Sequence, residues 1–320
     1  MRNEKSFALP VEFTWKRATA GYQWLDTDHG RLLCAIEALQ PDWQNSFERY
    51  ETTYQPLEER TGLFREFAAL EPSGQQVLSF ANRFGLLGAG SDRELDSSYG
   101  RVSVYGELLE LWKEEIEAFK LALEAWDAVA AGSRQALAKL KAKLAAPQFP
   151  LAVQRALHLD DEDPARAALS LVQRLTDVRL REHVETRLRF RGNFPRLNVS
   201  LVPTTLLGAL WLQFAAAVDG LKRFQQCAQC GAPFEVSRDP KTGKRRDARF
   251  CSARCRVGHY RERIEQARRL ESTGMTAQRI ADELSTRAVT VRGWLTAVQK
   301  PVPIARRKWT LQKKSRRHGR

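Results

Sequence analysis

Apolar residues recur three and four positions apart along much of the 320-residue chain, which predicts a mainly helical protein. Two such stretches lie between Leu63 and Leu87. They are separated by Glu71-Pro72-Ser73-Gly74, so we expect a helix, a turn and a second helix. From Ser103 to Leu144 the pattern predicts a long amphipathic helix, a break at Gly132 and another helix.

The segments between these helices carry weaker patterns. Residues 1–60 are rich in aromatic side chains but show no sustained period, so short elements are expected there. The stretch from Gly85 to Gly100 is rich in Gly and Ser and is interpreted as a loop. Asp163 precedes Pro164 and an apolar run, which favours an N-cap on a new helix over a metal site made by the neighbouring acids.

The period changes to two between Val184 and Val202, on both sides of Gly192-Asn193, which predicts a β-hairpin. After Pro203 an apolar helix is expected up to Asp219. The fold class predicted from these patterns is mainly α with α+β character: a helical N-terminal domain with one β-hairpin, then two smaller C-terminal modules.

Positive charge is confined to the C-terminal hundred residues. Residues 1–220 carry 26 Lys/Arg against 30 Asp/Glu, whereas residues 221–320 carry 26 against 8. Basic residues at this density displace counterions from phosphates, which favours a nucleic-acid partner. A solubilising tail is the alternative, and residues 306–320 are expected to be a basic, disordered extension.

Localisation and membrane association follow from what the chain lacks. It has no apolar run long enough to cross a bilayer, and Met1-Arg2-Asn3-Glu4-Lys5 does not lead into a signal peptide. Its five cysteines are not spaced like a disulfide framework. The sequence therefore predicts a cytoplasmic protein without a membrane partner.

Four cysteines form two closely spaced pairs. Cys227-x2-Cys230 is followed by Gly231, which can adopt the positive φ of a tight turn, and Cys251-x3-Cys255 places two sulfurs one helical turn apart. Four thiolates complete a tetrahedral shell and leave no open position, so we expect one structural Zn²⁺ per chain. A redox dithiol and unrelated buried cysteines are the alternatives.

Two further residues of metal-binding type are not expected to be ligands. Cys34 is flanked by apolar residues and is expected to be a small core residue, not a nucleophile. His259 follows Cys255 by one helical turn and could replace a cysteine as ligand, but exposure toward nucleic acid is the preferred interpretation.

The cysteine segment resembles a known family. It resembles the treble-clef zinc fingers of the bacterial CGNR type through Phe234, Arg245-Arg246, Arg249-Phe250-Cys251-Ser252, Cys255-Arg256 and Tyr260-Arg261-x-Arg263. Arg256-Val257-Gly258 stands where that family has Gly-Asn-Arg. The resemblance implies a DNA-binding transcription regulator with a ligand- or stress-responsive N-terminal domain. The segments 62–68 and 80–87 are similar to those of uncharacterised bacterial proteins.

A second motif follows the cysteines. Thr276 can cap a short helix with apolar residues at Ile280 and Leu284, and a turn leads into a second helix whose Val291 and Trp294 are expected to pack back on the first. This pattern is similar to the helix-turn-helix of resolvases and many bacterial regulators. The resemblance implies that the second helix enters the major groove of DNA.

Candidate contacts to DNA follow from that resemblance. Arg287, Thr290 and Arg292 are expected to contact base edges or nearby phosphates of double-stranded DNA. Arginines of the preceding helix are expected to contact the phosphate backbone: Arg254, Arg256, Arg261, Arg263, Arg268 and Arg269. A helical hairpin used for protein contact is the alternative.

Three hypotheses of function remain open. The preferred one is a DNA-binding regulator that is not an enzyme and that dimerises or senses through its N-terminal domain. An enzyme acting on nucleic acid would need Asp26, Asp28 and His29 as a metal site, although such residues are more often just a loop. An adaptor binding RNA or protein is the third. The predicted domains are residues 1–150, 151–225, 226–263 (zinc module), 264–299 (helix-turn-helix) and 300–320 (tail).

Overall fold

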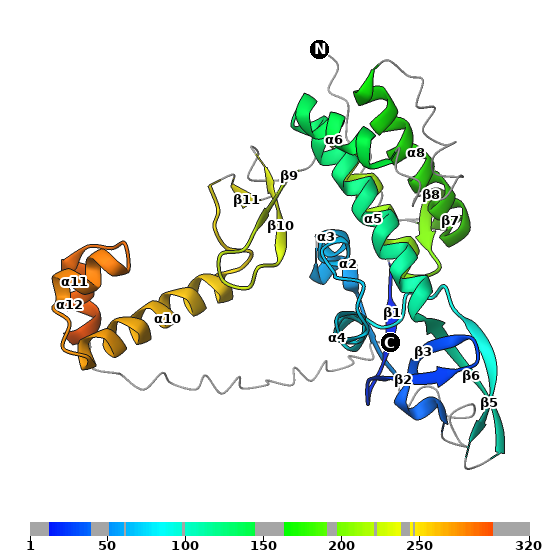
Figure 1. Ribbon diagram of the computed structural model, residues 1–320, viewed down its shortest axis with the longest axis horizontal. Coiled ribbons are helices and arrows are strands. Elements are labelled where there is room, and N and C mark those ends of the chain that lie inside the picture. The colour runs from blue at the N-terminus through cyan, green and yellow to red at the C-terminus, as the bar shows by residue number, and fades with distance from the viewer. Residues whose placement is uncertain are drawn as a thin grey trace, which may run out of the picture. The chain divides into compact units, whose positions relative to one another are not determined.

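The computed structural model describes residues 13–39, 51–60, 62–97, 100–144, 163–190, 197–220, 223–237, 244–245 and 247–296. They form a mixed fold of helices and several small sheets, in two compact units, residues 1–252 and 253–320 (Figure 1). The border between the units falls between the two cysteines of the second pair, whereas the sequence-based borders lie after residues 225 and 263. The predicted tail lies outside the described residues.

The first unit combines a helical core with short sheets. Its helices are η1 (Ile36–Leu39, a 3-10 helix), α2 (Pro56–Glu59), α3 (Leu63–Ala68), α4 (Gly74–Phe84), α5 (Leu109–Ala130), α6 (Arg134–Leu144), α8 (Pro164–His183) and α9 (Leu206–Asp219). Its strands are β1 (Trp15–Ala18), β2 (Tyr22–Thr27), β3 (Gly30–Ala35), β4 (Glu51–Tyr54), β5 (Ser91–Ser97), β6 (Gly100–Leu108), β7 (Val184–Phe190), β8 (Leu197–Pro203), β9 (Arg223–Gln226), β10 (Pro233–Ser237) and β11 (Lys244–Arg245).

The strands pair in four sheets. The largest has the order β2-β3-β6-β5 and is antiparallel throughout. Strands β1 and β4 form an antiparallel pair, as do β7 and β8. In the three-stranded sheet β11-β10-β9, strand β9 is antiparallel to β10 and β11 is parallel to it. This last sheet carries the first cysteine pair in the turn between β9 and β10.

The core of the first unit forms around α5. Phe119 of α5 contacts Phe67 of α3 edge-on, with ring centroids 5.6 Å apart, and Trp211 of α9 with centroids 4.1 Å apart. All three side chains are fully buried. One apolar cluster extends from Phe13 to Ala217, so the chain before and after residue 150 shares a single core.

The helices predicted from periodicity are confirmed in the first unit. The expected helix, turn and second helix are α3 and α4, and α5 and α6 are separated at Gly132, whose φ is +62°. The side chain of Asp163 accepts the Ala165 N–H at 2.9 Å and Pro164 occupies the first turn of α8. The predicted hairpin is β7–β8, and the apolar helix after it is α9.

The first unit also contains more sheet than the one predicted hairpin. The segment interpreted as a loop contains β5, and the helix predicted from Ser103 begins only at Leu109 because β6 occupies the residues before it. Strand β5 has Leu95 as its one apolar residue, so no local pattern marks it. Its pairing with β6 along the whole strand bonds the backbone groups on that side and decides its conformation.

A buried carboxylate holds the loop that follows α4. Glu107 of β6 is fully buried, and its two carboxylate oxygens accept the backbone N–H groups of Leu87 at 2.9 Å, Gly88 at 2.6 Å and Ala89 at 3.1 Å. Desolvation by burial raises the pKa of Glu107 to about 7, although the three N–H donors act in the opposite direction. Glu107 therefore titrates in the neutral range.

This pKa predicts that the folded protein loses stability as the pH rises. The unfolded chain releases the Glu107 proton near pH 4.5, whereas the folded chain keeps it up to about pH 7. The contribution is thus complete below the lower value, declines between the two values by up to about 3 kcal/mol in all, and is lost above the higher one. In Glu107→Gln this pH dependence should disappear. The amide NH2 group of the glutamine cannot accept a hydrogen bond from a backbone N–H, so the free energy of unfolding should also fall by about 1–3 kcal/mol under acidic conditions.

Urea unfolding near pH 5 and near pH 7 measures both effects. Glu110→Gln is the matched control, because the Glu110 carboxylate is exposed and pairs with Lys113 in the adjacent turn. If Glu107→Gln kept the pH dependence of the wild type, the assignment of this titration to Glu107 would be wrong.

The second unit is a small three-helix structure. Its helices are α10 (Ala253–Ser272), α11 (Ala277–Glu283) and α12 (Ala288–Thr296). The side chain of Thr276 accepts the Arg279 N–H, which confirms the predicted N-cap of α11. Among the described residues of both units, no helix is long and apolar enough to cross a membrane.

Candidate metal centre and nucleic-acid interface

The first cysteine pair lies in the tight turn of the β9–β10 hairpin. Pairing of Gln226 with Pro233 closes the hairpin, and inside it the Cys227 N–H donates to the Ala232 carbonyl at 3.0 Å. The Gly231 N–H donates to the Cys227 carbonyl at 2.9 Å, and Gly231 has a φ of +70°, which is the conformation expected from its place in the sequence. The turn therefore holds both cysteines on a short, internally bonded loop.

The second cysteine pair lies where the chain enters α10. Cys251 comes two residues before the helix and Cys255 lies in its first turn, as the three-residue spacing predicted. Two bonds bring the segments together: the Ala228 N–H donates to the Arg249 carbonyl at 2.8 Å, and the Cys251 N–H donates to the Cys227 Sγ at 3.3 Å. Backbone N–H donors of this kind stabilise a thiolate.

The four sulfurs gather at one point. The Sγ atoms of Cys227, Cys230, Cys251 and Cys255 lie within 4.8 Å of one another, and those of Cys230 and Cys251 are 3.6 Å apart. Tetrahedral zinc with bonds of about 2.3 Å places its sulfurs about 3.8 Å apart, so the spacing fits. The predicted ligand set is therefore close enough to bind one metal ion. His259 does not belong to this group of ligand atoms.

The thiols of Cys227 and Cys34 have opposite pKa shifts because their surroundings differ. Burial raises the pKa of the Cys227 thiol, but N–H donors from Cys251, Cys230 and Gln229 outweigh it and lower the value to about 6. Cys34 is fully buried among apolar residues of the first unit, and burial raises its pKa to about 12. Cys34 is thus a neutral core thiol, as predicted.

The cysteine hairpin packs against the helical core of the first unit. Phe224 of β9 contacts Phe64 of α3 edge-on, with ring centroids 5.2 Å apart, and the guanidinium of Arg65 lies 5.1 Å from the Phe224 ring centroid. A Cβ on Gly62 would lie 2.9 Å from the Pro233 carbonyl oxygen, so the backbones approach as closely as glycine permits. The hairpin is therefore anchored to α3.

The second unit is held by its own small core. Ala267 of α10, Ile280 and Ala281 of α11, and Val291 and Trp294 of α12 are buried together. This arrangement confirms the predicted packing of the two short helices against each other. Ser285 in the turn between them has a φ of +46°.

Most of the candidate nucleic-acid residues lie on the surface of this unit. Arg256 and Arg261 of α10 are exposed, as are Arg287 before α12 and Arg292 within it, and Thr290 is half-buried. Arg292 lies on the side of α12 that does not carry Val291 and Trp294, and Arg287 lies immediately before the helix. They are therefore accessible to a partner.

Arg263 has a structural role that the sequence did not predict. Its guanidinium donates to the Leu284 carbonyl at the end of α11 and lies 5.4 Å from the Trp294 ring centroid. Trp294 also donates its Nε1–H to the Tyr260 hydroxyl at 3.0 Å. Arg263 thus joins α10 to α11 and α12, and any phosphate contact would be secondary to this role.

Sequence reasoning missed one exposed side chain on α12. Val289 has 70% of its surface exposed, beside Arg287 and Thr290. Its exposure could have been predicted from the sequence, because helical spacing places Val289 away from Val291 and Trp294.

The acidic candidate near the N-terminus is a hairpin turn. Asp26 and Thr27 end β2, Gly30 begins β3, and Asp28 and His29 are the exposed residues between them. Asp26 forms an ion pair with Arg31 across the strands at 3.6 Å. Among the described residues, the cysteines are the one group of at least three such side chains whose ligand atoms gather in this way. Asp26, Asp28 and His29 thus belong to the β2–β3 hairpin and its turn.

The predicted metal ligands thus gather at one point, and most of the candidate nucleic-acid residues are exposed. Comparison of the chain with known protein families, curated proteins and solved structures finds no match.

Proposed function

We propose that this chain is a zinc-containing, DNA-binding protein that reads a duplex site in the manner of a transcription regulator. In this proposal α11 and α12 act as a helix-turn-helix, and the four cysteines hold one structural zinc in a treble-clef-like module related to the CGNR type. The observation that carries it is the division of α12 into a buried face and an exposed face.

The two faces of α12 suit a recognition helix. Val291 and Trp294 anchor the helix in the small core of the second unit. Arg287 just before the helix, Val289 in its first turn and Arg292 at its middle are exposed. Recognition helices of helix-turn-helix proteins contact base edges through residues near the amino end. Arginine pairs with guanine through two hydrogen bonds, so these side chains have the chemistry for direct readout.

Charge around these helices supports a polyanionic partner. Helix α10 carries six arginines and three glutamates within Ala253–Ser272, and the 100 residues from 221 onward hold the whole positive excess of the chain. Exposed arginines such as Arg256 and Arg261 would bind phosphates and position the helices without reading sequence.

The cysteine group supports zinc over other metals. Four thiolate ligands in tetrahedral spacing select soft or borderline ions, and zinc is the usual occupant of such closed sites. No coordination position remains for substrate or water, so the metal would stabilise the fold around Cys227 and Cys255 and take no part in catalysis.

Selection from a randomised duplex pool tests the proposed readout. The full-length protein should enrich a defined motif, and its affinity should fall steeply with salt. Arg287→Ala and Arg292→Ala should each weaken binding to the enriched site by about tenfold or more, as expected for losing a base contact worth about 1–3 kcal/mol.

Arg174→Ala is the matched control, because Arg174 is an exposed helical arginine of the first unit and its loss removes the same charge. Its affinity should stay within about twofold of the wild type. Binding without any enriched motif, equally weakened in the three variants, would reject sequence reading by α12. Stronger retention of unrelated RNA than of duplex DNA at equal salt would reject DNA as the partner.

A further inference from the structure

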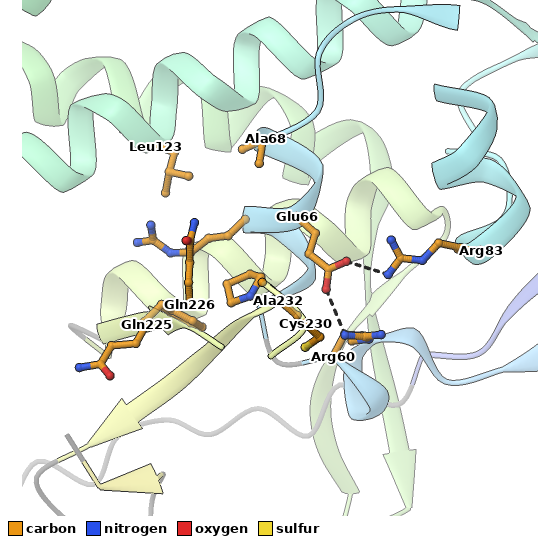
Figure 2. A pocket seen from close by; sticks show the side chains of 14 residues that line it. Arg60, Glu66, Ala68, Arg83, Leu123, Gln225, Gln226, Cys230 and Ala232 are labelled. Atoms are coloured by element: carbon orange, nitrogen blue, oxygen red, sulfur yellow. Dashed lines mark hydrogen bonds and ion pairs between the residues drawn. The ribbon is translucent and has the colours of Figure 1, made fainter. Parts of the chain in front are cut away.

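A pocket of about 740 Å³ lies between α3 and the cysteine hairpin, wholly within the first unit (Figure 2). Its walls come from segments far apart in the sequence: Arg60 and residues of and after α3, then Arg83, Leu123, and residues 224–226 and 230–233 of the cysteine hairpin. The volume lies within the range of about 300–1,000 Å³ that is usual for small-molecule sites. The function proposed above does not use this pocket.

Three arginines and one glutamate line the pocket. Glu66 pairs with Arg60 at 3.4 Å through one carboxylate oxygen and with Arg83 at 3.0 Å through the other, as the dashed lines in Figure 2 show. The third arginine, Arg65, forms a bidentate pair with Asp127 at 2.8 and 2.9 Å. Among these described side chains, three guanidinium groups therefore face two carboxylates.

Arg60 and Arg83 carry more hydrogen-bond donors than their bonds to Glu66 use. Each guanidinium has five N–H groups, and Glu66 accepts a single bond from Arg60 and a single bond from Arg83. The side chain of Glu66 is 13% exposed, whereas those of Arg60 and Arg83 are 38% and 51% exposed. The carboxylate is thus sheltered between two arginines that line the pocket and are themselves partly exposed. Such planar forks match carboxylate and phosphate groups.

The opposite wall of the pocket carries amide and apolar side chains. Gln225 and Gln226 of β9 add amide groups, and Leu123 and Phe224 add apolar surface. Cys230 and the two residues after it also line the pocket, so its contents would touch the turn that holds the first cysteine pair.

We infer that this pocket binds a small organic anion, whose carboxylate or phosphate is held by Arg60 and Arg83 and whose body lies against the cysteine hairpin. This inference concerns the first unit and holds independently of whether α12 binds DNA. Occupancy would add contacts between α3 and the hairpin, and it would therefore stabilise the turn around Cys230.

Calorimetric titration of the full-length protein with inorganic phosphate, citrate and AMP at constant ionic strength tests this inference. Adenosine serves as the neutral probe. At least one anion should bind with one molecule per chain and adenosine should not. Citrate and the two phosphate probes distinguish a carboxylate ligand from a phosphate ligand. The absence of saturable binding by all three anions at millimolar concentration would overturn the proposal.

Two variants with opposite expected effects on anion affinity distinguish a loss of recognition from a loss of folding. Arg83→Gln should weaken anion binding by about tenfold or more, because it removes a charge-assisted hydrogen bond. Arg187→Gln is the matched control, because Arg187 also pairs with a glutamate and its side chain is also 51% exposed, but it lies on β7 outside the pocket. Its affinity should remain within about twofold of the wild type.

Glu66→Gln should tighten binding, because it frees both Arg60 and Arg83 from their carboxylate partner. A defect in folding would weaken binding in Glu66→Gln and Arg83→Gln alike. Weaker binding in Glu66→Gln with unchanged thermal unfolding, or equal affinity of Arg83→Gln and Arg187→Gln, would show that the arginines of this pocket do not recognise the anion.

Discussion

Cys227→Ser is expected to abolish metal binding and to unfold the cysteine hairpin, whereas the purified wild type should contain about one zinc ion per chain. Three thiolates and a hydroxyl leave a tetrahedral shell incomplete, and structural zinc contributes about 10–16 kcal/mol of apparent binding free energy in small zinc modules. The short turn from Cys227 to Ala232 buries little apolar surface of its own, so this contribution is the main one that orders it.

Metal content by mass spectrometry and thermal unfolding with and without a chelator measure the effect. Cys34→Ala is the matched control: it also removes one thiol, but this thiol lies in the apolar core of the first unit. Cys34→Ala should be less stable and still hold about one zinc per chain. Retention of a full zinc equivalent by Cys227→Ser, or a wild type that takes up no zinc after reconstitution, would contradict the four-cysteine site.

Loss of metal also has a consequence inside the first unit. The hairpin contributes Gln225, Gln226 and Cys230 to the wall of the anion pocket. If the hairpin loses its order in Cys227→Ser, the arginines on the other wall remain but the body of the ligand loses its contacts. Anion affinity should then fall together with zinc content, because the cysteine hairpin forms part of both sites.

The sequence predicted the elements that local chemistry decides. The helices α3, α4 and α9 follow from apolar spacing, and Asp163 and Thr276 cap helices as their positions suggested. The metal-ligand set was also predictable from the sequence, because each cysteine pair lies within a few residues and its spacing is typical of a zinc site.

Features that depend on distant pairing were not predicted. Strand β1 pairs with β4 across more than thirty intervening residues, and the polar strand β5 exists through its bonds to β6. The anion pocket is of the same kind, since Glu66, Arg83 and Gln226 come together only when the hairpin packs on α3. No sequence window contains such a site, whereas a hairpin or a capped helix fits in one.

Trp294→Ala is expected to unfold the second unit. The indole is the largest side chain in a core of five buried residues, it donates to the Tyr260 hydroxyl at 3.0 Å, and the Arg263 guanidinium lies over its ring. Truncating a buried tryptophan costs about 3–5 kcal/mol, and a core this small supplies about as much in total. Hydrogen exchange should therefore lose protection throughout α10, α11 and α12 and keep it in α5.

Val289→Ala is the matched control on the same helix, because it also removes apolar atoms but from a side chain that is 70% exposed. Its exchange protection should equal that of the wild type, with a stability change within about 0.5 kcal/mol. Normal protection of α11 in Trp294→Ala would show that the indole does not hold the unit together. Val289→Ala should keep the fold, so any loss of its affinity for an enriched duplex would come from the exposed surface of α12. Trp294→Ala would instead lose affinity because the helix itself unfolds.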